Sequence, residues 1–177
     1  ALSKHTKKII EKSPLYINNR IEIIANPIDL KLFSPTQKEE ARIHFDIRVA
    51  TPLLFYIPSY GSTVKGAHEF KDALIYIKEK YPDFHITLLM AGSATAMVEE
   101  DEYLYPVIHL GKFTDDRLLA KAYSAADATI IPSLEETFSN TAAESISCGT
   151  PIIGFKTGAI PEIAGDGLRG ESVPIGN

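Results

Sequence analysis

Residues 132–154 read PSLEETFSNTAAESISCGTPIIG, and this stretch decides the fold of the chain. The β-branched run before it, residues 128–131, predicts a buried strand. Several side chains between Thr137 and Thr141 can cap a helix, and Gly149 stands where a helix commonly ends. The stretch therefore predicts a strand, a polar loop, a short helix and a second strand.

The predicted polar loop has the features of an anion-binding site. The first backbone N–H groups of a helix have no partner within the helix, and the helix dipole is positive at this end. A loop that follows a buried strand and leads into such a helix therefore suits a phosphate group. Glu136 and Glu144 stand on either side of this site.

Each of these two glutamates also has a structural explanation. In a capping box, the carboxylate bonds the backbone N–H of a cap residue three positions earlier. Both Thr141-Ala-Ala-Glu144 and Ser133-Leu-Glu-Glu136 have this form. Capping does not explain both glutamates together with Phe138 and the flanking residues, so the sequence favours a ligand site. The capping alternative stays open for each glutamate.

Composition limits the class of protein. The chain has 177 residues, 45% of them hydrophobic, which is enough for one domain with a packed core. A net charge of −5 without a basic stripe argues against nucleic acid as a partner. The single cysteine, Cys148, excludes an internal disulfide framework and fits a reducing compartment.

The sequence contains no apolar run that approaches the length of a bilayer span, and no signal peptide opens it. We therefore expect a soluble, cytoplasmic protein. Residues 1–12 are cationic and carry a few lysines. We interpret them as a solvated helix face, with peripheral contact at the inner face of an anionic membrane as the alternative.

Predicted helices and strands alternate along the whole chain. We expect strands at residues 20–25, 52–57, 85–90, 107–110, 128–131 and 171–174. We expect helices within residues 1–13 and 37–45, after residue 66, and after an N-cap at Thr114. This order predicts an α/β fold, a Rossmann-like open parallel sheet with helices on both faces and right-handed crossovers.

Ligands of such sheets bind outside the carboxyl ends of the strands. Polar loops follow the predicted strands there, at residues 59–66, 91–94, 111–114 and 133–141. Lys65 ends the first loop at the start of a helix, where its ammonium can reach the oxygens of a diphosphate. The structural alternative is an ordinary solvated loop lysine.

Together these motifs resemble the nucleotide-sugar-binding domain of family 4 retaining glycosyltransferases, in the glycosyl transferases group 1, which have the GT-B fold. The resemblance rests on Glu136-Thr-Phe-Ser-Asn-Thr-Ala-Ala-Glu144, in which seven residues separate the glutamates. It also rests on Cys-Gly-Thr-Pro-Ile-Ile at 148–153 and Gly-Ala-Ile-Pro-Glu-Ile at 158–163. It covers about residues 26–176.

The resemblance implies a domain organisation. Residues 1–25 would be the tail of an N-terminal domain, and residues 26–29, Asn-Pro-Ile-Asp, would be an interdomain linker. Residues 30–177 would be the C-terminal nucleotide-sugar-binding domain, truncated before its last helices. In this family the acceptor binds to the N-terminal domain of the same protein.

The resemblance also implies roles for individual residues. Glu144 would hold the ribose hydroxyls of a nucleoside diphosphate sugar, and Glu136 the hydroxyls of the transferred sugar, because a carboxylate accepts two charge-assisted hydrogen bonds from a vicinal diol. With Glu136, Lys65 would be catalytic, because it stabilises the leaving diphosphate. The other implied donor-binding residues are Gly66, Lys112, Phe113, Phe138, Ser139, Asn140 and Thr141.

The implied reaction is transfer of a sugar onto a glycan, lipid or other acceptor, as in polysaccharide biosynthesis. No cofactor or metal is expected, because the five histidines show no metal-ligand spacing and the family needs no divalent cation. Family members often carry an arginine in the loop of Lys65, whereas none lies between Val49 and Arg117 here. A nucleotide-sugar epimerase of similar fold and a non-catalytic nucleotide-binding or interaction module remain alternatives.

Overall fold

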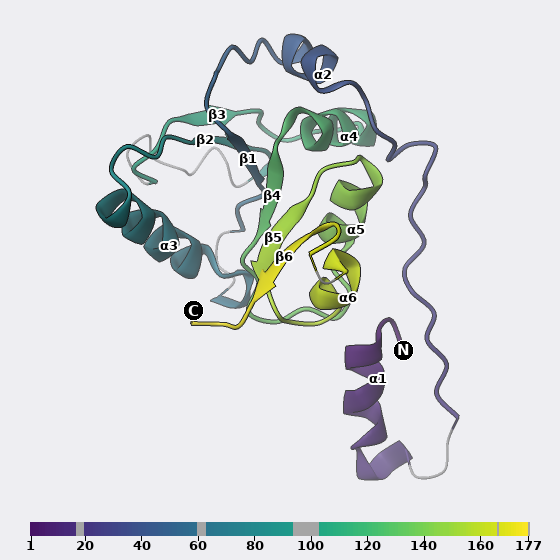
Figure 1. Ribbon diagram of the computed structural model, residues 1–177. Helices are drawn as coiled ribbons and strands as arrows, with labels where there is room; N and C mark the ends of the chain where they lie inside the picture. Colours follow the sequence, from purple (N-terminus) through teal and green to yellow (C-terminus); the bar gives the residue numbers. More distant parts are fainter. Residues whose placement is uncertain (17–19, 60–62, 94–102, 166, 177) are drawn as a thin grey trace.

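The computed structural model describes residues 1–16, 20–59, 63–93, 103–165 and 167–176. Within these residues, parallel strands form one six-stranded sheet in the order β3-β2-β1-β4-β5-β6 (Figure 1). The strands are β1 (Leu53–Tyr56), β2 (Thr87–Met90), β3 (Val107–His109), β4 (Ala128–Ile131), β5 (Ile152–Phe155) and β6 (Gly170–Val173). The predicted open parallel sheet is confirmed. Parts of two predicted polar loops, residues 60–62 and 94, lie outside the described residues.

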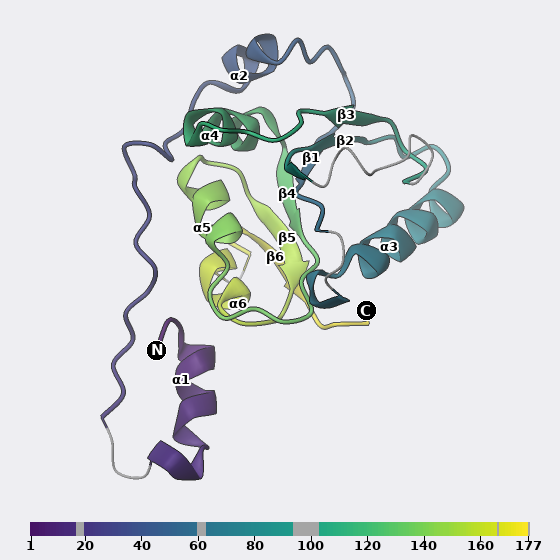
Figure 2. The same cartoon turned by 180° about the vertical axis from the view of Figure 1, so that it is seen from behind.

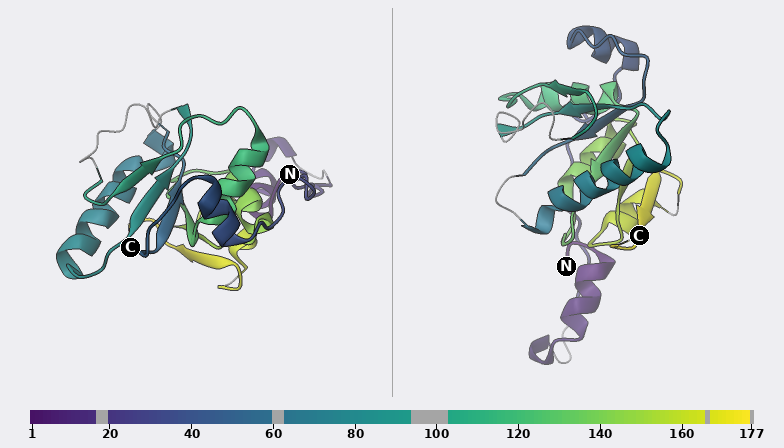
Figure 3. Two further views of the ribbon diagram at one scale, coloured as in Figure 1. Left: turned by 90° about the horizontal axis from the view of Figure 1, so that it is seen from above. Right: turned by 90° about the vertical axis from the view of Figure 1, so that its left-hand side faces the viewer.

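Helices cover both faces of the sheet, as predicted. They are α1 (Lys4–Glu11), α2 (Lys38–His44), α3 (Ala67–Lys80), α4 (Asp116–Ala125), α5 (Asn140–Ser147) and α6 (Ile160–Ala164), with short 3-10 helices η1 (Pro14–Tyr16) and η2 (Thr63–Lys65). Figures 1 and 2 show α3 on one face and α4, α5 and α6 on the other. Figure 1 and the right-hand view in Figure 3 show α1 projecting from the rest of the domain.

Strand β1 lies at the centre of the sheet and is buried on both faces. Leu53 and Phe55 pack in a cluster with Tyr123 of α4. Tyr56, which points the other way because side chains alternate along a strand, packs with Phe70 of α3. A parallel strand that is covered on both faces is expected to be apolar along its length, and this explains the continuous apolar run of β1 in the sequence.

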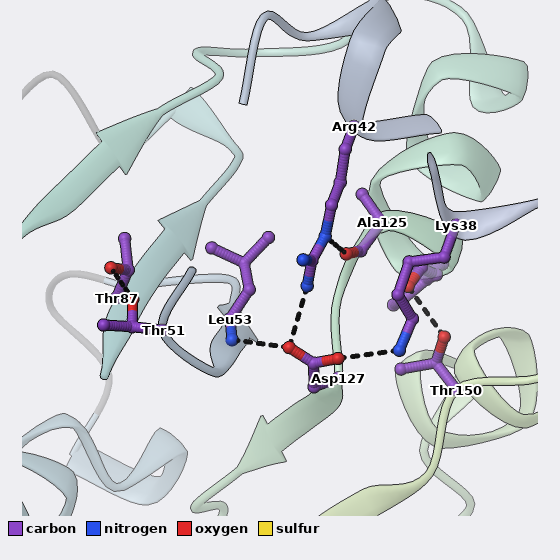
Figure 4. Close-up of polar contacts among 9 residues, drawn as sticks. Lys38, Arg42, Thr51, Leu53, Thr87, Ala125, Asp127 and Thr150 are labelled. Atoms are coloured by element: carbon purple, nitrogen blue, oxygen red, sulfur yellow. Dashed lines mark hydrogen bonds and ion pairs between the residues drawn. The ribbon is translucent and has the colours of Figure 1, made fainter. Parts of the chain in front are cut away.

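Asp127 anchors the amino ends of the central strands (Figure 4). Its carboxylate accepts hydrogen bonds from Lys38 Nζ at 2.7 Å, from Arg42 Nη2 at 2.8 Å and from the Leu53 backbone N–H at 2.7 Å. Burial alone would raise the pKa of Asp127, but the hydrogen bonds from Lys38 and Leu53 and the charges of Lys38 and Arg42 together outweigh it, and the pKa is lowered. This cluster fixes α2 against the start of β1, at the edge of the sheet opposite the polar loops.

Two local predictions are wrong. Residues 20–25 form no strand, because no described strand pairs with them; the backbone N–H of Ile24 bonds the Ala1 carbonyl instead, and its side chain is exposed. The N-cap of α4 is Asp115, one residue after Thr114, because the Asp115 carboxylate accepts the Arg117 N–H at 2.9 Å.

Candidate functional site

The polar loops meet at one edge of the sheet because all the strands are parallel. The loop after β1 packs directly on the loop after β4, where the Leu134 N–H bonds the Val64 carbonyl at 2.8 Å. Gly66, the N-cap of α3, has φ +67°, and a Cβ atom there would lie 1.7 Å from the Pro132 carbonyl oxygen. Only glycine fits this close approach. Gly66 therefore sets the position of the neighbouring Lys65.

The structure brings the two predicted catalytic residues into contact. Lys65 Nζ donates to Glu136 Oε1 at 2.7 Å, and the lysine side chain is 42% exposed whereas the glutamate is 13% exposed. No helix begins at Ser133 in this described segment, so the capping-box explanation of Glu136 is wrong. The carboxylate is held by a cation from the neighbouring loop instead of by a helix N-terminus.

A small cavity opens beside this ion pair. Its volume is about 150 Å³, and Lys65, Glu136 and Thr141 reach it from three segments: η2, the loop after β4 and the first turn of α5. The other residues that line it are Tyr56, Ile57, Ser59, Ile130, Ile131, Pro132 and Ser133. A cation, a carboxylate and a helix N-terminus therefore converge on one hollow at the carboxyl ends of β1 and β4.

The N-terminus of α5 is built around a strained residue. Ser139 is the N-cap, with φ +76°, and its Oγ accepts the Ala142 N–H at 3.4 Å. A residue with a Cβ atom costs about 1–2 kcal/mol in this left-handed conformation. Asn140 and Thr141 follow as the first helical residues, whose N–H groups have no acceptor within the helix. Strain at this turn is typical of a functional site.

Glu144 lies one turn further along α5, and its partner is a tyrosine from another helix. Tyr123 of α4 donates its hydroxyl to Glu144 Oε2 at 2.9 Å. The capping-box explanation is wrong here too, because Ser139, not Thr141, caps α5. Burial raises the pKa of Glu144, the nearby charge of Asp116 adds to the rise, and the hydrogen bond from Tyr123 opposes it.

The segment predicted as a linker contacts the start of α5. Asn26 Nδ2 donates to Asn140 Oδ1 at 2.8 Å, although 114 residues separate them. Phe138, beside the N-cap, is buried. The sequence indicated Asn26 only as the start of an interdomain linker, because a contact of this range has no local signal.

Helix α1 contacts the loop that carries Glu136. The hydroxyls of Ser3 and Thr6 donate to the Thr137 carbonyl at 3.1 and 3.4 Å, and the His5 backbone N–H donates to Glu162 Oε1 at 3.2 Å. A larger cavity of about 480 Å³ lies here, lined by His5, Ile9, Val64, Glu135, Glu136, Thr137 and Thr157. Glu136 lines both cavities, so residues 1–12 add surface to the site.

Two predicted donor-binding residues lie apart from this group. Lys112 and Phe113 follow β3, one of the two edge strands of the sheet, and neither lines a cavity named above. Lys112 is exposed, and Phe113 packs on the core with its ring centroid 6.0 Å from that of Phe45. A structural role accounts for Phe113 in this structure, and contact of either residue with a nucleotide base stays a prediction.

The described residues lack both a metal cluster and a membrane-spanning helix. They contain no group of three or more His, Cys, Asp or Glu side chains placed to hold a metal ion. None of their helices has the length and apolar character needed to cross a membrane. Cys148 is buried, and burial raises the pKa of its thiol to about 12, which leaves it without nucleophilic character.

Comparison with known proteins was made by sequence and by structure. A family model described as glycosyl transferases group 1 matches residues 51–177. The D-inositol 3-phosphate glycosyltransferase of Paenarthrobacter aurescens is 27% identical over 161 residues, which are 86% of this chain and 39% of that protein. This chain therefore spans about two fifths of the length of that relative.

Two solved structures share the fold over 100% of this chain. The sucrose-phosphate synthase of Thermosynechococcus elongatus matches with a TM-score of 0.81 at 22% identity, over 45% of its own chain. HepE of Anabaena, solved in complex with UDP-glucose, matches with a TM-score of 0.69 at 23% identity, over 50% of its own chain. At these identities the likeness shows the fold alone.

Proposed function

The chain belongs to the glycosyl transferases group 1 family, and on this basis we propose that it is the donor-binding domain of a retaining glycosyltransferase that uses a nucleoside diphosphate sugar. The observation that carries the proposal is the small cavity, where Lys65, Glu136 and the first turn of α5 converge. A diphosphate needs a cation and free N–H donors, and a sugar needs an acceptor of its hydroxyls. Residues from three segments that line the cavity can supply all three.

The arrangement suggests how the donor lies. A cavity of about 150 Å³ is smaller than the roughly 300–1,000 Å³ of sites that enclose drug-sized ligands, so it fits the junction of diphosphate and sugar alone. The diphosphate would lie against Lys65 and the N–H groups of Asn140 and Thr141, and the sugar hydroxyls against Glu136. Glu144 is four residues after Asn140, about 6 Å along α5, where it can accept the ribose hydroxyls.

These residues also account for the chemistry. The leaving diphosphate gains negative charge as the bond to the sugar breaks, and groups aimed at that charge stabilise the transition state more than the ground state. Lys65 supplies a point charge and the N-terminus of α5 supplies dipoles. The loop that carries Lys65 has no arginine. Among the described residues that line the small cavity, Lys65 is the only cation. We propose that these donors suffice without a metal ion.

The rest of the reaction requires a second domain. Because this chain spans about two fifths of its relative, the proposal includes an N-terminal domain that binds the acceptor across a cleft from Glu136. The relative named for D-inositol 3-phosphate and the structure with UDP-glucose are consistent with nucleotide-sugar chemistry. We place the reaction in the cytoplasm, with the acceptor being a glycan, a lipid or another hydroxyl-bearing molecule.

A thermal-shift panel tests the proposal. The chain is melted alone and with the diphosphates of uridine, guanosine, adenosine and thymidine, and with the matching nucleosides as controls. A nucleotide at 100 times its Kd stabilises by about 2.7 kcal/mol, which raises the Tm of a domain this size by about 5–10 °C. We expect such a shift with one or more diphosphates and none with the nucleosides.

A turnover assay tests whether the active site is split between two domains. The purified chain is mixed with nucleoside diphosphate sugars and a panel of acceptors, and release of the diphosphate is measured. We expect binding without transfer. Turnover by this chain alone would show that it carries a complete active site.

A further inference from the structure

Tyr123 joins the core of the domain to the candidate site. Its side chain is completely buried, and its ring lies edge-on to Phe55 with centroids 5.0 Å apart. Its backbone carbonyl accepts the Thr150 hydroxyl at 2.7 Å, which ties α4 to the end of α5. Ring and backbone are therefore both fixed, and the hydroxyl, which also lies within hydrogen-bond reach of the Thr141 side chain, donates its proton to Glu144 Oε2.

The hydroxyl acts as a donor at any physiological pH. Burial, and then the charge of Glu144, raise the pKa of Tyr123 well above its ordinary value, so the phenol keeps its proton. A carboxylate rotates freely about its last side-chain bond, where the torsional preference is broad. A donor fixed in the core removes that freedom and sets the plane of the carboxylate.

We propose that Tyr123 is a positioning residue, whose hydroxyl holds the Glu144 carboxylate in the plane that receives both ribose hydroxyls of the bound nucleotide. This inference rests on the proposed function, because that proposal assigns the ribose to Glu144. The Tyr123 hydroxyl donates to one lone pair of Glu144 Oε2, from the side of the carboxylate that faces the core. The remaining acceptor sites of the carboxylate are left for a vicinal diol.

Tyr123 differs from an ordinary core aromatic in what its hydroxyl does. Phenylalanine would make the same packing contact with Phe55 without burying a polar atom, so packing alone does not require the hydroxyl. The chain offers a matched control in Tyr105, which is also buried but packs in the cluster around α3, on the other face of the sheet. The Tyr105 hydroxyl is buried without a hydrogen-bond partner among the described residues, so removing it takes a phenol oxygen from the core, breaks no hydrogen bond and leaves Glu144 untouched.

Calorimetry on Tyr123→Phe and Tyr105→Phe tests the proposal. The probes are the nucleoside diphosphate that the unaltered chain binds best, among those of uridine, guanosine and adenosine, and its 2′,3′-dideoxy analogue. For Tyr123→Phe we expect about a tenfold loss of affinity for the ribose form and less than a twofold loss for the dideoxy form. Tyr105→Phe should match the unaltered chain with both ligands.

The outcomes separate this inference from the proposed function. If Tyr123→Phe changes both affinities equally or neither, Tyr123 is a core residue and the inference is overturned. If the unaltered chain binds both forms equally, the assignment of the ribose to Glu144 fails. If it binds no nucleotide, the proposed function itself fails.

A measurement on the unaltered chain covers the case in which Tyr123→Phe does not fold. The buried hydroxyl proton of Tyr123 should exchange slowly enough to be seen by proton NMR. We expect its resonance to shift when the ribose form is added and to stay in place with the dideoxy form. A resonance that does not shift at a saturating concentration of the ribose form would overturn the proposal.

Discussion

Replacing Lys65 by methionine removes the ammonium from the small cavity and keeps the length of the side chain. A hydrogen bond to a charged group contributes about 1.5–3 kcal/mol to binding. The Lys65 side chain is 42% exposed, so solvent screens part of this interaction. We therefore expect a loss of about 1.5–2 kcal/mol in the binding free energy of a nucleoside diphosphate, which is about a 10- to 30-fold rise in Kd.

The effect of Lys65→Met on stability should be smaller. The mutation breaks the 2.7 Å ion pair with Glu136. A partly exposed pair of this kind contributes about 1 kcal/mol or less to folding. Glu136, at 13% exposure, keeps limited access to water once its cation is gone. We expect the Tm to fall by about 2–4 °C, with a single cooperative transition.

Titration calorimetry measures the nucleotide Kd of Lys65→Met and of a control variant. The control is Lys78→Met, at the far end of α3, where the ammonium lies 5.4 Å from the ring centroid of Tyr105 and away from both cavities. Lys78→Met should leave the nucleotide Kd unchanged. A Kd for Lys65→Met within twofold of that of the unaltered chain would show that Lys65 is an ordinary solvated loop lysine.

Three further predictions use other parts of the structure. Glu144→Gln should weaken binding of both the bare nucleoside diphosphate and the complete sugar donor, whereas Glu136→Gln should weaken the donor alone; equal losses for the bare nucleotide in calorimetry would contradict this division. Gly66→Ala should lower the free energy of unfolding in urea by more than about 2 kcal/mol, because a Cβ atom would lie 1.7 Å from the Pro132 oxygen at φ +67°; a loss under 1 kcal/mol would refute the close approach. Because the folded-state pKa of Asp127 is lowered, the stability from its carboxylate is complete above about pH 5 and is lost as the pH falls below about 4. Urea unfolding of Asp127→Asn should therefore differ from the unaltered chain at pH 7 and approach it at pH 3; an equal gap at both values would count against the anchor.

Most of the fold was predictable because its signals are local. Four-residue runs of apolar or β-branched residues such as β1 and β4 are largely buried, and glycine ends α5, where Gly149 has φ +80°. Once the strands are known to be parallel, the carboxyl-end loops must share one edge. The contact between Lys65 and Glu136 follows from that geometry, because their strands are neighbours in the sheet.

The features that escaped prediction depend on contacts between distant residues. Residues 20–25 have the composition of a strand but no described partner strand, and composition alone does not supply one. A serine gives no sign that it will adopt a left-handed conformation, so the cap at Ser139 was one of several candidates. Tyr123 matched the apolar face of its helix, and only the hydroxyl on an otherwise apolar stripe could have pointed to a buried polar partner such as Glu144.

We propose that a nucleoside diphosphate binds at the carboxyl edge of the sheet, between η2 and α5. An NMR titration of the ¹⁵N-labelled chain with nucleoside diphosphates measures binding and its location together. We expect saturable shifts that centre on the amides of Lys65, Gly66 and residues 139–144. Amides around Asp127, at the opposite edge of the sheet, should stay in place. Unchanged spectra with every nucleotide, or shifts centred on the Asp127 edge, would contradict the claim and favour a non-catalytic interaction module.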